Sequence, residues 1–353
     1  MVGNRHEKDA RPLYPLPKDT AATAVLRGEL AVCLNLGLRF DRFTPFGPDW
    51  SLEGPAKKRA LDNLVQVGNS AGKDPGYRDL VRQHYRRWRE MVRAGGALND
   101  CVFEAGPEWR MAVGLGRGGV LETGFAFHHV YGFPYLPGSA LKGLTRSYVL
   151  WVVAGNLGVP YTVPGEPRPG RTPLQYLEAI LTEPDESERR AALERLQDSP
   201  GLPEDAVVRT AEAVRLLAEH KFDGSPSLSV SQCIRVYRDV FGASGHKGRR
   251  GSVVFFDAVP VEPPVLKVDV MNPHYGEYYR GAEAPADYLS PVPVYFLAVE
   301  AGSRFAFAVG GADEELARKA KSWLVSALRD FGAGAKTSAG YGYFSFPSPG
   351  VRK

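Results

Sequence analysis

Residues 121–147 read LETGFAFHHVYGFPYLPGSALKGLTRS, and the expected order of elements is clearest in this stretch. Its first ten residues are typical of a strand, and Pro134 and Pro137 exclude a helix up to that point. Ser139 then stands where a helix N-cap is expected, and an apolar pattern continues to about Val153. The stretch therefore predicts a strand, a Gly-Ser turn and a helix, in that order.

Strand-like and helix-like segments flank this stretch on both sides. Strands are predicted at residues 108–116, 251–260, 266–271, 292–300 and 303–311. An amphipathic helix follows at 313–331, and a Gly-rich loop and a last strand close the chain. This order is the βαββαβ pattern of a ferredoxin-like sheet. We therefore expect an α+β fold with a ferredoxin-like (RRM-like) antiparallel sheet, both helices on one face and the other face open to a ligand or partner.

Two further regions are mainly helical. Helical patterns at residues 55–68 and 77–94 predict a helical N-terminal extension over residues 1–105. The ferredoxin-like domain is expected at 106–350. Within it, charge-laced helical sequence predicts a solvated insertion at about 156–245.

The composition excludes several classes of protein. The chain has 353 residues, 44% of them hydrophobic and 24% charged, which is typical of a globular and not of a disordered protein. The 44 Lys and Arg against 40 Asp and Glu leave a net charge of +4, which permits basic patches on a balanced surface. Three distant cysteines form no CxxC motif and suit a reducing cytosol, and no apolar stretch reaches the ~20 residues of a membrane span. We expect a cytoplasmic protein with no cofactor, no metal and no membrane contact.

The first segment with binding chemistry is the predicted helix start. The free N–H groups and the dipole of a helix N-terminus favour an anion, here beside Gly138 and Ser139. Lys142 lies in the first turn, and Arg146 lies one turn later on the same face. The segment fits a phosphate held by backbone amides and cations, and it fits equally a capped helix with solvated basic side chains.

The second segment is the glycine-rich loop GAGAKTSAGYG at residues 332–342. Glycines such as Gly334 and Gly340 let a backbone approach a phosphate chain closely, and they stand on either side of Lys336, Thr337 and Ser338. The loop is neither a P-loop nor a dinucleotide-binding motif, because the helix precedes it. An ordinary flexible connection is the alternative. We expect the two segments to meet in the fold as one cationic cradle for a ribose-phosphate chain.

Two basic segments add to these. Residues 242–252 read GASGHKGRRGS, and a flexible loop with His246, Lys247, Arg249 and Arg250 suits contact with an RNA backbone or is a solvent loop. The helix at 77–94 carries a stripe of arginines that either binds phosphates or an acidic partner or is a solvated face. Its members are Arg78, Arg82, Arg86, Arg89 and Arg93.

A catalytic set does not emerge from the sequence. His128 and His129 are adjacent, so in a strand at most one faces a given site, and a core or turn role fits them better than metal binding. Asp257 and Asp269 lie on predicted strands without the spacing of a two-metal centre. A cluster of His274 with Tyr275, Tyr278 and Tyr279 fits either base stacking or an interface.

The combination of segments resembles a known family. Residues 121–147 resemble the strand-loop-helix signature of the RAMP superfamily of CRISPR proteins, and FGAGAKTSAGYGYF at 331–344 resembles its C-terminal glycine-rich loop. FGASGHKGRRGSVVFFDAVP and LKVDVMNPHYGEYY are similar to one branch, subunit six of the type III-B (Cmr) effector. The resemblance spans about residues 108–346.

This resemblance implies a non-catalytic subunit of a ribonucleoprotein effector for antiviral defence. It implies binding to the backbone of the guide RNA near its 3′ portion, capping of the RAMP filament, and contact with target RNA only indirectly. Its implied protein partners are the other Cmr subunits, including the backbone RAMP proteins and the small helical subunit. The guide contacts it implies fall on Gly138, Ser139, Lys142, Arg146, Gly334, Lys336, Thr337, Ser338 and Gly340.

Two rival functions remain open at this point. One is a metal-independent endoribonuclease that processes guide RNA, with His128, His129 or His246 as general acid or base. The other is a purely structural module that docks neighbours through the arginine stripe and the inserted helices.

Overall fold

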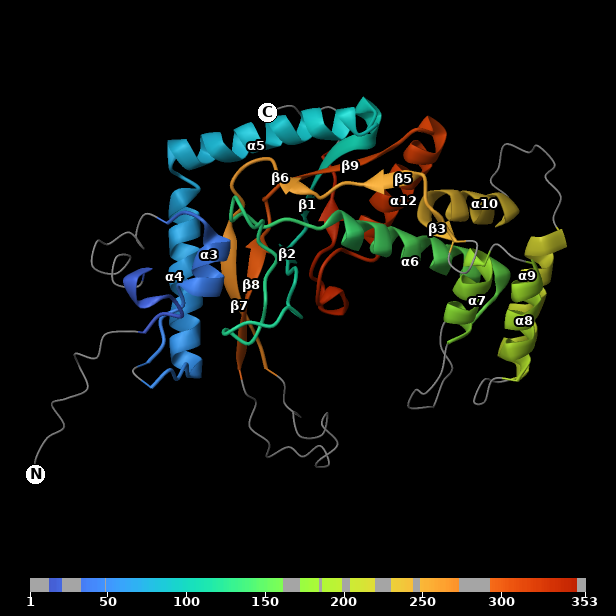
Figure 1. Ribbon diagram of the computed structural model, residues 1–353, viewed down its shortest axis with the longest axis horizontal. Helices are drawn as coiled ribbons and strands as arrows, with labels where there is room; N and C mark the ends of the chain where they lie inside the picture. Colours follow the sequence, from blue (N-terminus) through green and yellow to red (C-terminus); the bar gives the residue numbers. More distant parts are fainter. Residues whose placement is uncertain are drawn as a thin grey trace, which may run out of the picture.

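The computed structural model describes residues 13–20, 33–47, 49–160, 172–183, 186–198, 204–219, 230–243, 248–272 and 293–347. Two of the predicted binding residues, His246 and Lys247, lie outside the described residues, as does the His274 and tyrosine cluster. The described part is an elongated α+β molecule in which helices flank antiparallel strands (Figure 1). The α+β class predicted from the sequence is therefore confirmed.

The main sheet has the strand order β10-β1-β9-β5. Its strands are β1 (Val102–Pro107), β5 (Val253–Phe255), β9 (Phe305–Gly311) and β10 (Phe344–Ser345), and β6 (Val259–Pro260) also pairs with β9. Every pairing is antiparallel. Because side chains alternate along a strand, β9 turns Phe305, Phe307 and Val309 to one face and Ala306 and Ala308 to the other.

The first face of this sheet is covered by two helices. They are α6 (Gly138–Leu157) and α12 (Glu314–Asp330), which pack against each other and onto β5 and β9. The buried side of α12 carries Ala320, Leu324 and Leu328, which join Phe305 and Phe307 in one hydrophobic cluster. The expectation that both helices lie on one face is confirmed.

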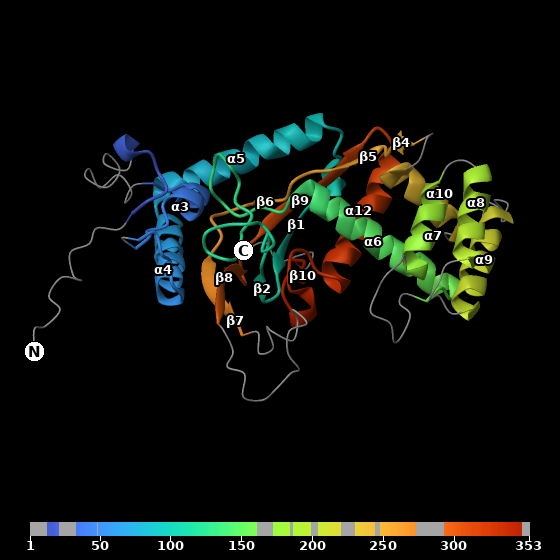
Figure 2. The ribbon, with the colours of Figure 1, turned by 60° about the horizontal axis from the view of Figure 1, so that its bottom comes forward.

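The second face was expected to be open, and this expectation is wrong. The helix α5 (Pro75–Ala94) lies across it, as Figures 1 and 2 show, and packs on β6 and β9. Trp88 and Val92 of α5 are buried against Ala306 and Ala308, whose small side chains leave room for the helix. The indole Nε1–H of Trp88 also donates to the carbonyl of Asp257, at 2.9 Å.

A second, three-stranded sheet carries the order β2-β8-β7. Its strands are β2 (Arg110–Met111), β7 (Leu266–Met271) and β8 (Val294–Glu300). The helix α4 (Gly54–Ala71) packs on β7 and β8. The Asn69 side chain of α4 accepts from the Leu266 N–H at 2.9 Å and donates to the Leu266 carbonyl at 3.0 Å, so it takes the place of a neighbouring strand at that residue.

The N-terminal helices share the core of the sheets. Leu61 and Leu64 of α4 belong to the same buried cluster as Leu266 and Leu297. The short helix α3 (Leu36–Arg42) adds Leu36 and Phe40 to it. The helices predicted at 55–68 and 77–94 are present as α4 and α5, and the division of the chain at residue 105 stays a prediction.

The remaining helices lie at one end of the molecule (Figures 1 and 2). They are α7 (Pro173–Thr182), α8 (Glu186–Gln197), α9 (Glu204–Glu219) and α10 (Val230–Phe241), within the range predicted for the insertion. The strands β3 (Gly242–Ala243) and β4 (Arg249–Arg250) pair after them, and 3-10 turns lie at Asn99–Cys101 and Thr337–Ala339. Within the described ranges, no helix is both long and apolar enough for a bilayer span.

Candidate nucleic-acid interface

The glycine-rich loop after α12 is a closed and docked structure. The Ala333 N–H donates to the Gly342 carbonyl at 2.8 Å, which closes the two ends of the loop on each other. The loop is also bound to the β2 region, because the Gly342 N–H donates to the Arg110 carbonyl and the Ala335 N–H to the Ala112 carbonyl, both at 2.7 Å. The loop is thus a built element and not an ordinary flexible connection.

Two glycines of this loop serve different purposes. Gly334 has a φ of +104°, and a Cβ there would lie 2.3 Å from the Ala112 carbonyl oxygen, so its lack of a side chain is needed for docking. Gly340 has a φ of +89°, and a Cβ there would meet nothing within 4 Å. The backbone around Gly340 is therefore the side of the loop that a ligand can approach.

The side chains between these glycines also differ, since Lys336 packs on the protein and Ser338 is exposed. Lys336 adopts a left-handed φ of +60°, and its Nζ lies 5.4 Å from the centroid of the Phe296 ring and 3.6 Å from the Met271 sulfur. Lys336 therefore lies along the β7–β8 sheet. Thr337 and Ser338 form the 3-10 turn, in which Ser338 is exposed and Thr337 half-buried.

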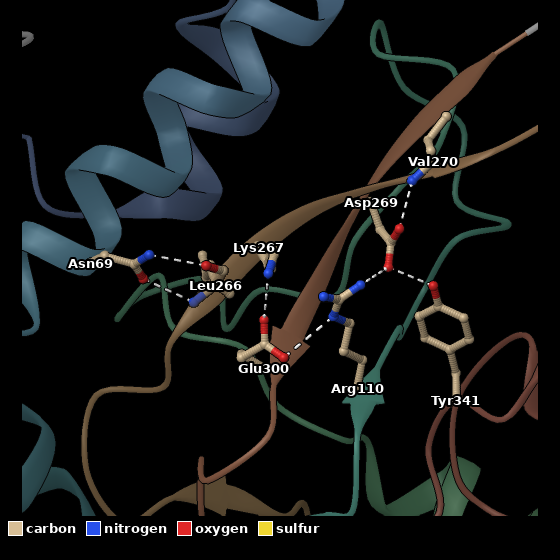
Figure 3. Close-up of polar contacts among 8 residues, drawn as sticks. All are labelled: Asn69, Arg110, Leu266, Lys267, Asp269, Val270, Glu300 and Tyr341. Carbon is tan, nitrogen blue, oxygen red and sulfur yellow. Dashed lines mark hydrogen bonds and ion pairs between the residues drawn. The ribbon is translucent and has the colours of Figure 1, made fainter.

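A network of polar side chains holds the far end of the loop (Figure 3). The Tyr341 hydroxyl donates to the Asp269 carboxylate at 2.6 Å, and the Arg110 guanidinium bonds the same carboxylate at 2.6 Å. Arg110 also bonds Glu300 at 3.3 Å. Burial alone would raise the pKa of Asp269, but the hydrogen bonds from Tyr341, the Val270 N–H and Arg110 outweigh it and lower that pKa.

The start of α6 differs from the expectation. Pro137 is the N-cap residue, and the Ser139 side chain makes no capping hydrogen bond, so the predicted Ser139 cap is wrong. The Gly138 N–H instead donates to the Asp257 carboxylate at 2.6 Å, and the N–H groups of Ala140 and Leu141 donate to the Pro137 carbonyl. Asp257 thus occupies the anion position at Gly138 that the sequence assigned to a phosphate.

Two of the predicted binding residues, Lys142 and Arg146, are basic side chains of α6. Lys142 is half-buried, and burial together with the charges of Arg146 and Arg250 lowers its pKa. Arg146 is not free, because it bonds the Glu178 carboxylate at 2.8 Å and the Tyr237 hydroxyl at 3.0 Å. It therefore ties α6 to the insertion helices α7 and α10. Arg249 pairs with Asp239, and the Arg250 residue is exposed.

The two glycine-containing segments do meet in the fold. A cavity of about 380 Å³ lies between them, walled by Ala140 and Leu144 of α6 on one side and by residues 332–335 of the loop on the other, with residues 113–117 closing it. The lysines have separate surroundings, however, since Lys142 lies with Arg146 and Arg250, and Lys336 lies on the Phe296 ring. The α6 start and the glycine-rich loop therefore line the same cavity, but their lysines lie in different surroundings and form no single cationic cradle.

The adjacent histidines are part of an aromatic cluster. The His128 ring packs against Tyr131, Phe133 and His84, and its Nδ1 accepts from the Val130 N–H at 3.2 Å. Burial, His128 and Arg87 lower the pKa of His84 to about 4, so His84 is neutral at pH 7. Among the described residues, no three His, Cys, Asp or Glu side chains form a group able to hold a metal ion.

Sequence reasoning missed the roles of Asp257, Asp269 and Tyr341. The two aspartates were read as isolated carboxylates on strands, and their partners lie 119 and 72 residues away along the chain. No local sequence signal links such distant residues, so the fold alone reveals these contacts.

Comparison with known proteins identifies the family. The model of the RAMP superfamily matches residues 92–345. A relative described as CRISPR system Cmr subunit Cmr6, from Pyrococcus furiosus, is 34% identical over 273 residues, which are 75% of this chain and 72% of that protein. The chain belongs to the Cmr6 branch of the RAMP superfamily.

Solved structures are also similar to this chain. The crystal structure of Cmr6 from Pyrococcus furiosus is 32% identical and has a TM-score of 0.35, with 70% of this chain and 97% of that chain covered. A cryo-EM structure of the type III-B Cmr-beta complex bound to cognate target RNA contains a chain that is 17% identical, with a TM-score of 0.43 and coverage of 93% and 88%. The matched RAMP region contains both α6 and the glycine-rich loop.

Replacing Asp257 by alanine should lower the free energy of unfolding by about 1 kcal/mol, because the Gly138 N–H loses its acceptor at the start of α6. Denaturant unfolding measures this loss. Asp257→Asn keeps an acceptor oxygen and should retain most of the stability. An alanine variant as stable as the wild type would show that the contact does not support α6.

Replacing Asp269 by asparagine should destabilise the protein at pH 7 and have less effect in acid. The folded pKa of Asp269 lies below its ordinary value of about 3.9, so the charged carboxylate stabilises the fold above that value, and this stabilisation is lost as the pH falls through the folded pKa. Melting temperatures of both proteins from pH 7 to about pH 2.5 test this. A difference that stays constant over the whole range would contradict it.

Proposed function

We propose that this chain is a non-catalytic subunit of a type III-B CRISPR effector, where it binds the backbone of the guide RNA near its 3′ portion and caps the RAMP filament. One observation carries the proposal: the glycine-rich loop and the start of α6 lie against one cavity, although about 190 residues separate them in the sequence. The relative in Pyrococcus furiosus is a Cmr subunit, which supports assembly with other Cmr subunits, among them the backbone RAMP proteins and the small helical subunit.

The loop offers RNA a rigid and open surface. Its base is fixed by hydrogen bonds to the β2 region and by Tyr341, so little conformational entropy is lost when a ligand binds its outer side. Ser338 and Gly340 are exposed there and offer a hydroxyl and a closely approachable backbone. Such groups contact phosphate and ribose, which suits a subunit that holds guides of any sequence.

The patch of Lys142 and Arg250 offers the second contact. The positive charges of Arg146 and Arg250 lower the pKa of Lys142, and Arg146 pairs with the Glu178 carboxylate at 2.8 Å. Because cations held near one another repel, a phosphate placed between Lys142 and Arg250 relieves that repulsion. The guide would therefore run from this patch past the cavity to the loop.

The scaffold of this proposal is a ferredoxin-like core. The element order β1, α6, β5, β9, α12, β10 follows the βαββαβ pattern, and the sheet order β10-β1-β9-β5 supports it. In this arrangement the α6 start lies at the strand-to-helix junction of the first half of the core, and the glycine-rich loop lies at the helix-to-strand junction of the second half. Target RNA would reach this subunit only through its pairing with the guide.

Replacing Lys142 and Lys336 together by alanine should weaken guide-RNA binding by about tenfold, to the same extent for guides of different sequence, because phosphate contacts carry no sequence information. Fluorescence anisotropy with three labelled guides of unrelated sequence measures it. A double variant of Lys58 and Arg59, which are exposed on α4, is the matched control and should bind as the wild type does. A loss confined to one guide, or unchanged binding together with normal assembly, would contradict the proposal.

Incubation of the purified protein with repeat RNA in EDTA should leave the RNA intact. His128 is packed among aromatic rings and its Nδ1 accepts backbone N–H groups, so this ring nitrogen is already engaged within the fold. Denaturing gel electrophoresis of end-labelled RNA reads the outcome. Cleavage at one position, lost in a His128→Ala or His246→Ala variant, would favour a guide-processing endoribonuclease instead.

A further inference from the structure

The arginine stripe of α5 is built on one side of a rigid helix. It consists of Arg78, Arg82, Arg86, Arg89 and Arg93. With about 100° between successive residues, these five positions fall within about 80° around the helix axis and span about 22 Å along it. The helix is fixed at its start by Asp74, whose carboxylate accepts from the Tyr77 N–H at 2.8 Å. The stripe is therefore a straight row of cations with a set direction.

The packing of α5 turns this row toward solvent. Trp88 and Val92 are buried against the sheet, and Val81 is buried in a cluster with Phe133. Arg82, Arg86, Arg89 and Arg93 are all exposed, and Arg78 is partly buried. Figure 1 shows α5 along one edge of the molecule, over the sheet face opposite to α6 and α12. The stripe is thus separate from the proposed guide-binding surface.

The contacts of the stripe within the chain are weak ones. Arg82 lies 3.3 Å from the Glu262 carboxylate, and both side chains are about half exposed, so solvent screens the pair. The Arg89 guanidinium lies 5.8 Å from the centroid of the Tyr85 ring. The acidic residues of the same helix, Asp79 and Glu90, lie outside the stripe. Five cations in a row therefore keep most of their charge available to a ligand.

We propose that the arginine stripe binds the phosphodiester backbone of RNA, as a second RNA contact of this subunit. The spacing supports this ligand, since neighbouring arginines rise by about 4.5 to 6 Å along the axis and each guanidinium can bond a phosphate in a bidentate way. The inference rests on the proposed function only in that the chain works within an RNA-containing complex. It uses none of the same residues.

An acidic protein partner fits the stripe less well. The core of a protein interface is depleted in charged residues and enriched in large apolar ones. The exposed apolar residues of α5, Leu80 and Met91, lie on the other side of the helix, more than about 100° from the centre of the stripe. The stripe itself offers cations alone, which is the composition of a surface that follows a polyanion.

The test compares two triple variants of the full-length chain. Arg86, Arg89 and Arg93 are replaced by glutamine in one, and Arg190, Arg195 and Arg209 of the insertion helices are replaced by glutamine in the other, so that the net charge changes equally. Binding of a labelled single-stranded RNA is measured by anisotropy from 50 to 300 mM KCl. The stripe variant should reduce the slope of log affinity against log salt by about 2, since each phosphate contact on a single strand contributes about 0.7, and the control should keep the wild-type slope.

Three outcomes separate this inference from the proposed function. In the first outcome, the stripe variant has a reduced salt slope, and the Lys142 and Lys336 variant binds RNA as the wild type does. This outcome supports the stripe and overturns the proposed guide site. An unchanged slope in a stripe variant that melts as the wild type does overturns the stripe alone. A stripe variant that keeps the wild-type affinity for RNA but loses binding of labelled poly-glutamate would show an acidic protein to be the ligand and overturn the RNA assignment.

Discussion

The alternation of side chains along β9 is the constraint on which the molecule depends. Phe305, Phe307 and Val309 fill the layer beneath α6 and α12, while Ala306 and Ala308 admit α5 on the opposite face. A shift of one residue in the pairing of β1 with β9 would exchange the two sets. The position of α5, and with it the direction of its arginines, therefore follows from the register of a single central strand.

A small number of polar contacts then place the loops on this core. Asp257 bonds α6 through its carboxylate and α5 through its carbonyl, so one residue joins helices on both faces of the sheet. Asp269 holds Arg110 and Tyr341 at the end of the glycine-rich loop. Asp257 is exposed and Asp269 is partly buried, so the hydrogen bonds of these carboxylates, and not burial of their charge, fix the geometry around them.

Much of this architecture was predictable from local pattern. The strands β7, β8 and β9, the amphipathic helix before the glycine-rich loop and the helices α4 and α5 each carry a clear periodicity or stop signal. The strand predicted at the start of residues 121–147 is wrong, because that stretch makes only isolated bridges such as Phe127 with Pro134. The strand predicted at 108–116 is reduced to Arg110–Met111, and β1 lies earlier, at Val102–Pro107. The covering of the second sheet face by α5 was not predictable, because the small residues Ala306 and Ala308 read as ordinary strand residues. The engagement of Arg146 by Glu178 and Tyr237 was equally hidden, since an exposed cation and a paired one look the same in a sequence.

The Asn69 side chain has a consequence for the border of the three-stranded sheet. A strand at the border of a sheet displays unpaired N–H and C=O groups, and these can template pairing with the same strand of another copy. The Asn69 side chain on helix α4 bonds both the N–H and the C=O of Leu266, at one end of β7. A single amide thus occupies the pairing groups of this residue, which another strand would need in order to extend the sheet at this point.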